Sequence, residues 1–212
     1  MVNIWDAWIL APLPEHLFLA LGGLTIGITI SIPLATICLY SPRLAFIIVN
    51  IANLLQAFPS LAFLALVVPL LGLGFIPAIS AIILRALLPI IKNTYIGLSN
   101  IDPSLVEFAQ GLGLTPFQIL QNIRFPNAYP AIFSGIKFAS ILANGIAVLS
   151  VIIGSGGYGE IIFPALNQIN ITKMIIGVLP VIFISISLDI LFTLLERHIT
   201  PPPLQKKHVT SS

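Results

Sequence analysis

Two long stretches of this sequence contain no Asp, Glu, Lys or Arg, and they restrict the chain to few folds. The first covers residues 16–42 and the second covers residues 44–84. A helix that crosses a bilayer needs about 20 consecutive apolar residues. The second stretch has 41 residues, so it must contain one span, a turn and much of another span. The turn signal is the segment Gly-Leu-Gly-Phe-Ile-Pro at residues 72–77.

The composition indicates that most of the chain lies in a lipid bilayer. Of the 212 residues, 58% are hydrophobic and 8% are charged, whereas a soluble domain has about 25% charged residues. The net charge of +2 gives no reason to expect nucleic acid as a partner. The single cysteine, Cys38, lies in an apolar run and excludes a disulfide framework. Asp6 and Glu15 precede the first apolar run without a basic flank, so we expect no cleaved leader.

We predict an all-α membrane protein with five transmembrane helices in a single domain, residues 1–212. The spans are expected at residues 16–40, 44–71, 75–98, 127–153 and 173–196, with a loop at 99–126 and a tail at 197–212. Lys and Arg concentrate on the cytoplasmic side of membrane proteins. One set of connections carries Arg43, Lys92, Arg124, Arg197, Lys206 and Lys207, while the other carries Lys173 beside Asp6, Glu15 and Glu160. The N-terminus is therefore expected outside, and the C-terminus and the loop 99–126 in the cytoplasm.

The predicted spans contain prolines, and each can kink or break its helix. Five of them are Pro33, Pro59, Pro69, Pro89 and Pro180. A break at membrane depth needs protein or a water-filled cavity to cover the freed backbone groups. The segment Gln-Ala-Phe-Pro-Ser at residues 56–60 is the best candidate for a functional break, because it places two polar side chains beside a proline. Simple kinking is the alternative at each proline.

The loop carries the signals of a short helical hairpin. Asp102 precedes a proline, which is typical of a helix start. Gly111 and Gly113 can end that helix. Residues 115–118, Thr-Pro-Phe-Gln, form a capping box that starts a second helix, which we expect to stop before Pro126. Its many apolar residues allow two readings, a hairpin lying on lipid headgroups or a docking element for a cytoplasmic partner.

This loop resembles the cytoplasmic signature of permease subunits of bacterial ABC importers, which has Glu-Ala-Ala, a glycine six residues after the Glu, and Ile-x-Leu-Pro. The matching positions are Glu107, Phe108, Ala109, Gly113, Ile123, Phe125 and Pro126. Every spacing agrees, although two phenylalanines replace the first Ala and the Leu of the signature. The resemblance implies a coupling hairpin that sits in a groove of an ATPase subunit, where Gly113 permits the tight turn and Glu107 orients the hairpin or contacts the ATPase.

Three further segments resemble importers of glycine betaine, carnitine and choline. They are residues 85–97, 153–160 and 195–201. The resemblance implies a multi-pass permease of a bacterial or archaeal plasma membrane, paired with a second copy or a paralogue. It also implies an external binding protein and a cytoplasmic ABC ATPase dimer that holds the ATP and Mg, with no cofactor and no enzyme activity on this chain. Two alternatives stay open: an importer of an amino acid such as methionine, and a membrane scaffold that recruits a cytoplasmic partner without transport.

Other motifs do not indicate catalysis or metal binding. The glycine-rich run at residues 154–159 lacks the strand and the distant acid of a dinucleotide site. No G-x-x-x-x-G-K-[ST] motif occurs, so this chain is not expected to cradle ATP phosphates. His16, His198 and His208 lie far apart with no Cys or carboxylate at ligand spacing, so no metal site is expected.

Polar residues inside the spans are candidates for the transport pathway or for contacts between helices. The pathway candidates are Gln56, Ser60, Asn93, Asn144 and Ser150. Counted from the ends of their predicted spans, Lys137 and Asp189 lie at the same depth, whereas Arg85 lies roughly 9 Å nearer the outer face. An unpaired charge at this depth costs at least about 2.5 kcal/mol. We therefore hypothesise a Lys137–Asp189 ion pair, with snorkelling toward water as the alternative.

Overall fold

The computed structural model describes residues 5–200, and it is helical throughout, with no strand in that range. The fold class predicted from the sequence is therefore confirmed. Lys206, Lys207, His208 and most of the tail lie outside the described residues. A π-helical segment at Trp5–Leu10 precedes the first α-helix. The α-helices are α1 (Leu13–Cys38), α2 (Pro42–Ala57), α3 (Ser60–Leu71), α4 (Phe75–Ser99), α5 (Pro103–Gly111), α6 (Pro116–Ile119), α7 (Phe125–Leu149), α8 (Gly159–Asn167) and α9 (Ile171–Ile199).

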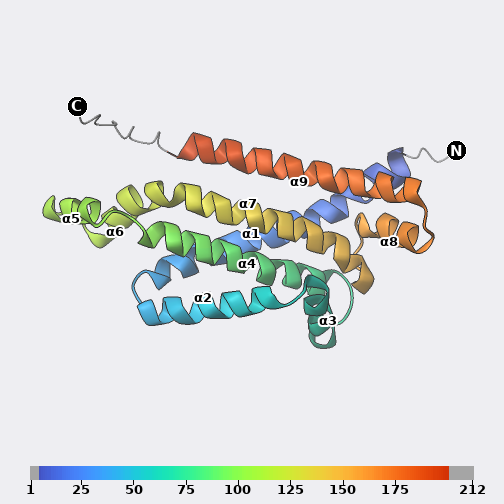
Figure 1. Ribbon diagram of the computed structural model, residues 1–212, viewed down its shortest axis with the longest axis horizontal. Coiled ribbons are helices and arrows are strands. Elements are labelled where there is room, and N and C mark those ends of the chain that lie inside the picture. Colours follow the sequence, from blue (N-terminus) through green and yellow to red (C-terminus); the bar gives the residue numbers. More distant parts are fainter. Residues whose placement is uncertain (1–4, 201–212) are drawn as a thin grey trace, which may run out of the picture.

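Four helical segments of the described range are long and apolar enough to cross a bilayer, and the pair α2 and α3 can form a fifth crossing. The long helices lie side by side, with α5 and α6 at one end of the molecule and α3 and α8 toward the other (Figure 1). We call these the hairpin end and the far end. The chain enters at the far end, crosses to the hairpin end in α1, and finishes at the hairpin end in α9 (Figure 1).

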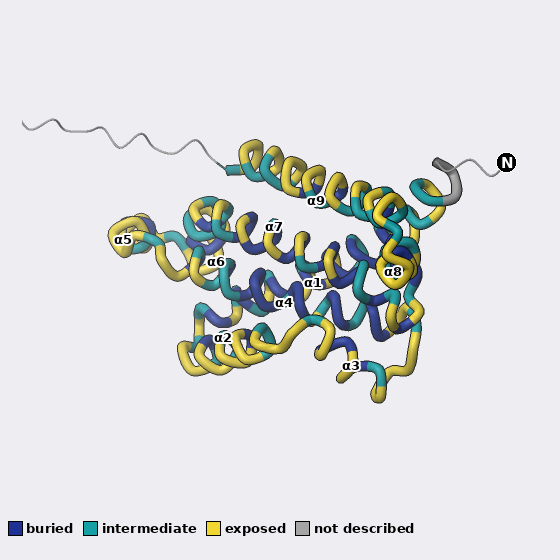
Figure 2. Tube along the Cα trace, turned by 45° about the vertical axis from the view of Figure 1, so that its right-hand side comes forward, coloured by how far each residue is buried: buried dark blue, intermediate teal, exposed yellow. Residues whose placement is uncertain are grey.

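Helix α4 is the central element, since it packs along α1 on one side and α7 on the other. Small residues let these helices approach closely, as is common in membrane proteins. A Cβ added to Gly27 of α1 would lie 2.9 Å from Ala86, and one added to Gly97 of α4 would lie 2.7 Å from Ala131. Buried residues follow α1, α4 and α7, whereas α2 and α9 are largely exposed (Figure 2). The core is thus a three-helix centre with two lightly covered outer helices.

The five prolines named above behave differently from one another. Four of them remain inside continuous helices, namely Pro33, Pro69, Pro89 and Pro180. Pro59 alone separates two helices, and α2 and α3 meet there at a bend of 103°. Phe58 before it is extended, with φ −70° and ψ 131°, which is the conformation that a following proline favours. The break predicted at residues 56–60 is present.

The helix that starts at the capping box does not stop before Pro126, and that expectation was wrong. It passes through a π-helical turn at Leu120–Arg124 and continues directly into α7. Within this wider turn the Phe125 amide donates to the Leu120 carbonyl, five residues back. Pro126 then occupies the first turn of α7, where a residue without an N–H costs little. The hairpin is therefore rigidly continuous with a membrane helix.

We predict that Gly135→Ala destabilises the contact between α4 and α7, whereas Gly145→Ala does not. A Cβ at Gly135 would meet the Pro89 carbonyl oxygen at 2.9 Å, and at Gly145 it would meet nothing within 4 Å. Overpacking of this kind costs about 1–3 kcal/mol, while alanine in an open helical site is favoured over glycine. Thermal unfolding of the purified protein, followed by circular dichroism, should show a lower midpoint for Gly135→Ala alone. Equal midpoints for the two variants would contradict this account of the packing.

Candidate functional site

The hairpin at residues 102–119 is fixed by local hydrogen bonds at each of its turns. The Ser104 amide donates to Asp102 Oδ1 at 2.9 Å, and hydrogen bonds from Ser104 hold the pKa of Asp102 below its usual value. After α5 the chain reverses at Gly113, whose φ of +79° is a conformation that glycine adopts readily. The Leu114 amide closes this turn on the Ala109 carbonyl at 3.1 Å. The predicted cap and glycine turn are both present.

The second helix of the hairpin starts at the predicted capping box. The Gln118 amide donates to Thr115 Oγ1 at 3.3 Å, and the Thr115 amide donates to Gln118 Oε1 at 2.8 Å. Each residue thus satisfies a backbone donor that the start of a helix leaves free. These reciprocal bonds fix the start of α6.

The seven signature positions divide into an exposed tip and an anchored base. Glu107 and Phe108 are exposed, and Ala109 is buried beneath them in α5. The three remaining positions after the glycine turn are half-buried, and they are Ile123, Phe125 and Pro126. Phe125 packs against the hydrophobic core of the membrane helices. The base of the hairpin is therefore packed against the membrane helices, while its tip is not.

Arg124 provides a second anchor that sequence reasoning did not identify as part of the site. Its Nη1 donates to the Leu98 carbonyl at 2.7 Å, in the last turn of α4. The carbonyls of a last helical turn have no partner within the helix, so the guanidinium both caps α4 and ties it to the hairpin. The signal that could have found it is a basic residue next to the hairpin, placed where α4 must end.

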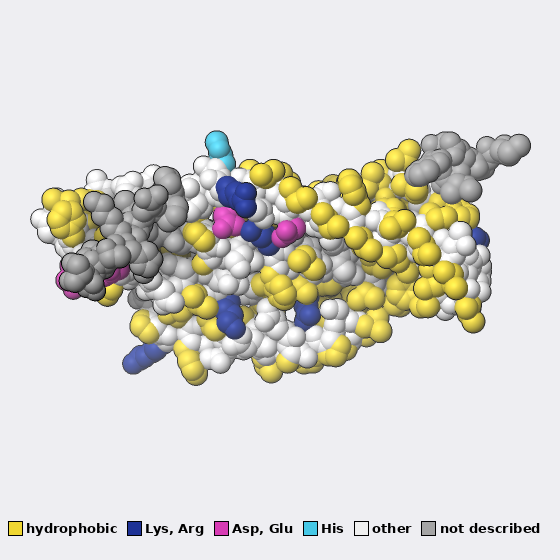
Figure 3. Space-filling model, turned by 45° about the horizontal axis from the view of Figure 1, so that its top comes forward, with side chains coloured by type: hydrophobic (Ala, Val, Ile, Leu, Met, Phe, Trp, Pro, Cys, Tyr) yellow, Lys and Arg dark blue, Asp and Glu magenta, His cyan; other side chains and the backbone are white. Residues whose placement is uncertain are grey.

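The tip of the hairpin exposes large apolar side chains beyond the ends of the long helices. The exposed fractions are 42% for Leu105, 69% for Phe108, 65% for Leu112 and 69% for Phe117. We call these four residues the hairpin face. Hydrophobic side chains cover much of the rest of the surface along the long helices (Figure 3). Because the hairpin is polar elsewhere and well capped, its exposed aromatic rings form a surface on which another protein or the headgroup region can bind.

The broken span forms the second part of the site. Arg85 of α4 is 8% exposed and reaches the bend between α2 and α3. Its Nη1 donates to the carbonyls of Leu55 at 3.1 Å and Phe58 at 2.9 Å, and its Nη2 donates to Ser60 Oγ at 3.3 Å. These carbonyls lie at the end of α2, where the intrahelical partners are missing. The buried guanidinium therefore stabilises the bend, and its Nε has no partner.

The five pathway candidates fall into two groups. Gln56 and Ser60 are half-buried on α2 and α3 beside the bend, whereas the half-buried Asn93 lies on α4 where it meets Gly135 of α7. Asn144 and Ser150 are fully buried within the packed helices, and their place in a pathway stays a prediction. Asn144 joins helices, because its partners lie on α1 and α9, whereas the Ser150 hydroxyl donates to the Ala147 carbonyl at 3.0 Å within its own helical run.

Asn144 connects α1, α7 and α9 near the far end. Its Oδ1 lies 2.7 Å from Nε2 of His16, which is fully buried in α1. Its Nδ2 donates to the Val181 carbonyl of α9 at 3.0 Å and to Ser185. This network explains why a histidine and an amide occur at membrane depth without any metal cluster in the range that the structure describes.

The ion pair between α7 and α9 has a different partner from the one expected. Lys137 Nζ lies 2.6 Å from Glu196 Oε2, whereas Asp189 is exposed and makes no ion pair. The depth count failed because it assumed that all spans end in one plane. In the structure α7 continues into the hairpin, while α9 ends alongside α7 without reaching α5 and α6 (Figure 1). Glu196 thereby comes level with Lys137.

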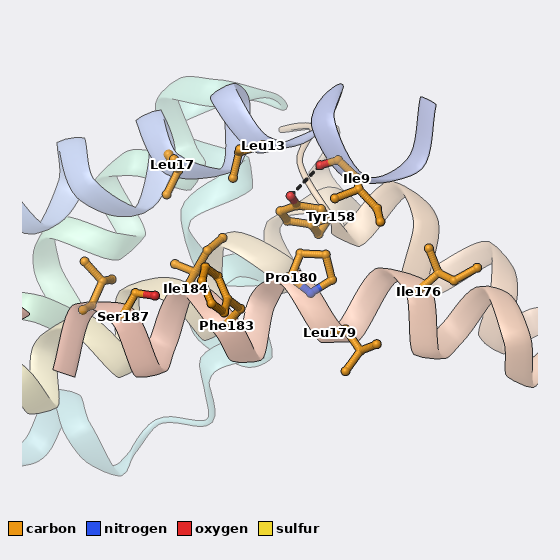
Figure 4. Close-up of a pocket in the computed structure, with 11 residues that line it drawn as sticks. Ile9, Leu13, Leu17, Tyr158, Ile176, Leu179, Pro180, Phe183, Ile184 and Ser187 are labelled. Atoms are coloured by element: carbon orange, nitrogen blue, oxygen red, sulfur yellow. Dashed lines mark hydrogen bonds between the residues drawn. The ribbon is translucent and has the colours of Figure 1, made fainter. Parts of the chain in front are cut away.

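An apolar cavity of about 680 Å³ lies between α1 and α9 at the far end. Its walls include Leu13, Leu17 and Phe183, and Tyr158 borders it with a hydroxyl that donates to the Ile9 carbonyl at 2.7 Å (Figure 4). Few polar groups face it, so its lining suits a hydrocarbon chain and offers nothing to hold a charged solute.

Comparison with known proteins identifies the family of this chain. Residues 24–201 match the family described as binding-protein-dependent transport system inner membrane component. The chain belongs to this family. It is therefore a multi-pass, inner-membrane permease component of a transport system, and the resemblance noted in its loop sequence is confirmed.

Individual relatives of this permease are similar over nearly the whole chain. It is 34% identical to the carnitine transport permease protein OpuCB of Listeria monocytogenes, over 91% of this chain and 88% of that protein. It is 36% identical to the choline transport system permease protein OpuBB of Bacillus subtilis, over the same shares of the two chains. Among solved structures, an inward-facing form of the MetNI methionine ABC transporter gives a TM-score of 0.84 at 19% identity, covering 95% of this chain and 100% of that chain.

We predict that the bend of the permease depends on Arg85 more than on Ser60. Arg85→Leu leaves the carbonyls of Leu55 and Phe58 without a donor, and each buried group without a partner costs about 1–3 kcal/mol. Ser60→Ala removes one hydroxyl and should cost about 1 kcal/mol or less. The unfolding midpoint in detergent and the yield in the membrane should both fall sharply for Arg85→Leu alone. A thermally stable Arg85→Leu variant would contradict the capping role.

We also predict that a charge exchange rescues Lys137 only with Glu196. Lys137→Glu places two carboxylates together, so the unfolding midpoint should fall. Adding Glu196→Lys restores an attractive pair and should recover most of the loss, because the reversed charges occupy the same two positions. Adding Asp189→Lys instead should recover little. Rescue by Asp189→Lys and not by Glu196→Lys would overturn the observed pairing. The unmodified chain and the three variants are compared by thermal unfolding at low and high salt.

Proposed function

We propose that this chain is the membrane-spanning permease subunit of an ATP-driven importer of osmoprotectants such as glycine betaine, choline or carnitine. The observation that carries the proposal is the similarity to permeases named for these compounds, at 34–36% identity over about nine tenths of the chain. One of them is the glycine betaine/carnitine/choline transport system permease protein OpuCB of Bacillus subtilis. Several relatives match this chain over most of their length and are named for the same class of substrates. We therefore expect the same substrate class for this chain.

The alternatives are less well supported. The likeness to the methionine transporter is one of fold, since the sequences are only 19% identical, so it gives no reason to expect methionine as the substrate. A scaffold without transport activity does not agree with membership in a family of transport components. Osmoprotectant transport is thus the reading that accounts for both the sequence similarity and the fold.

In this proposal the hairpin is the contact with a separate cytoplasmic ATPase dimer. The hairpin face presents Phe108 and Phe117 to a partner, and large aromatic side chains are common anchors of protein interfaces. ATP and Mg would be held by the ATPase, while this permease would contribute no catalytic group. The rigid base, formed by Phe125 and the Arg124–Leu98 hydrogen bond, would pass movement of the ATPase to α4 and α7.

The proposed orientation puts the hairpin end in the cytoplasm. Arg43, Arg124 and Arg197 belong to the first turn of α2, the hairpin and the last turn of α9, all at that end. Lys173, near the start of α9, lies at the far end. The acidic Glu15 and Glu160 lie in the first turns of α1 and α8, at the same end. This distribution agrees with the positive-inside rule. The far end would then receive the external binding protein.

Two permeases, either two copies or this chain with a paralogue, would enclose the pathway. The α2–α4 side carries the bend, the buried Arg85 and the half-buried Gln56. Polar groups at membrane depth face protein or water in most membrane proteins, so this side is the one that would line the pathway. ATP binding would favour the outward-facing state, because the closed ATPase dimer binds that state better.

The test is uptake of labelled glycine betaine, choline and carnitine in a host without its own osmoprotectant importers, expressing this chain with its genomic neighbours. We predict that Gly113→Ala lowers uptake and that Gly111→Ala does not. Both sites are sterically open, but only Gly113 has a positive φ. An L-residue in that conformation costs about 1–2 kcal/mol, equivalent to roughly five- to thirtyfold in the population of the correct turn.

Two measurements make this uptake experiment decisive. Co-purification of the ATPase reports docking, and the amount of permease in the membrane reports folding. Uptake of an amino acid but of none of the three osmoprotectants would overturn the substrate class and keep the permease. A bound ATPase with no uptake of any solute would favour the scaffold, and equal uptake by the two glycine variants would contradict the role of the turn.

A further inference from the structure

A small hollow between α2 and α4 combines three kinds of chemical group. It has a volume of about 340 Å³, and it is lined by the ammonium-bearing Lys92, the amide of Asn50 and the rings of Phe46 and Tyr95, among others. This size lies within the range of small-molecule sites. No part of the hairpin contributes to it, so it is separate from the surface proposed to bind the ATPase.

The Lys92 side chain lies along the exposed α2–α4 side and points away from the hairpin end. Its Nζ lies 3.4 Å from Oδ1 of Asn53 in α2. Asn53 is eleven residues from the start of α2 at Pro42, or about 16 Å, whereas Lys92 is seven residues from the end of α4 at Ser99, or about 10 Å. The side chain therefore runs deeper than its own backbone. A lysine that snorkels to the headgroups would point the other way.

The charge of Lys92 has no carboxylate partner. Within residues 5–200 the one ion pair is Lys137–Glu196, on the other side of the helix bundle between α7 and α9. Arg85 lies seven residues before Lys92, which puts it two turns away on the same face of α4. Its contacts are also to neutral oxygens, and its Nε has no partner. The α2–α4 side thus carries two positive charges that the described residues leave without a counter-charge.

This combination of groups favours some ligands over others. A fixed ammonium attracts a carboxylate and repels a cation, and both effects strengthen when water is excluded. Aromatic rings such as those of Phe46 and Tyr95 attract methylated ammonium groups. A zwitterion can satisfy the rings with its ammonium and Lys92 with its carboxylate. A purely cationic amino alcohol can satisfy only the rings.

We propose that Lys92 is a specificity-determining residue of the pathway, which binds the carboxylate of zwitterionic osmoprotectants in transit and disfavours cationic choline. This inference rests on the proposed function and narrows its substrate class to compounds that carry both a methylated ammonium and a carboxylate. Arg85 holds the bend and adds to the positive potential that the carboxylate meets on the same side.

The experiment uses the complete transporter, with permease, ATPase and binding protein, in proteoliposomes of neutral lipid with ATP supplied to the ATPase. The variants are Lys92→Gln, which keeps a hydrogen-bonding group beside Asn53 but removes the charge, and Lys92→Arg, which keeps the charge. Initial rates are measured for glycine betaine and choline, each at saturating concentration with the same binding protein. These two substrates share the trimethylammonium group and differ chiefly in the carboxylate.

The expected result is a loss of glycine betaine transport of about tenfold in Lys92→Gln, the size of one charge-assisted hydrogen bond, with Lys92→Arg within about twofold of the unmodified chain. The choline rate, when the binding protein delivers choline, should stay unchanged or rise in Lys92→Gln. Because the binding protein is common to all variants, a change in the ratio of the two rates comes from the permease.

Several results would overturn the inference while leaving the proposed function intact. One is a glycine betaine rate in Lys92→Gln equal to that of the unmodified chain. Another is an equal fall for both substrates, which would assign Lys92 a purely structural role. A third is an effect of Lys92→Gln that appears only in vesicles with anionic lipid, which would assign Lys92 to a phospholipid headgroup. An unmodified transporter that binds its ATPase but carries neither compound would instead overturn the proposed function, and this inference with it.

Discussion

The hydrocarbon core of a bilayer contains no water, so every backbone carbonyl released by a helix break must find a donor within the protein. The break before Pro59 releases carbonyls at Leu55 and Phe58, and Arg85 donates to both. A guanidinium can do this because it has five donors in one plane, and it reaches Ser60 on the far side of the bend as well. The bend of α3, the shape of the α2–α4 side and the location of its positive charge all depend on this contact.

The packing divides the helices into a fixed centre and a looser periphery. Close approaches at Gly27, Gly97 and Gly135 lock α4 between α1 and α7, and interiors packed to this density do not deform continuously. Helix α9 is held by the Asn144–Val181 hydrogen bond, by the Lys137 ion pair and by a smaller apolar cluster with Tyr158, Ile184 and Leu188. A permease must change between two arrangements without losing its fold. A locked centre with more lightly covered outer helices suits both demands, and in the proposed function α4 and α7 would carry the motion of the hairpin.

Local features of the structure could be predicted from the sequence, whereas contacts between helices could not. The cap at Asp102, the turn at Gly113 and the capping box at Thr115 each depend on a few neighbouring residues, and all are present. The partner of Lys137 depends on where α9 ends relative to α7, and no sequence rule gives that offset. Likewise, five prolines carry the same local tendency, and the one that breaks its span is the one whose freed carbonyls meet Arg85. Tertiary contacts decided these cases.

The polar groups at membrane depth are of two kinds, and the difference between them bears on function. Lys137 with Glu196, and Asn144 with Val181, find their partners within the chain, so the folded protein leaves neither group unpaired. The ammonium charge of Lys92 is not balanced in this way, because its partner at 3.4 Å is the neutral amide oxygen of Asn53. A charge that has no counter-charge within the folded protein must be balanced by a group from outside the protein. In a permease that means water or solute in the pathway, and among small solutes a carboxylate balances an ammonium best. Selection among substrates can therefore occur inside the membrane as well as at the external binding protein.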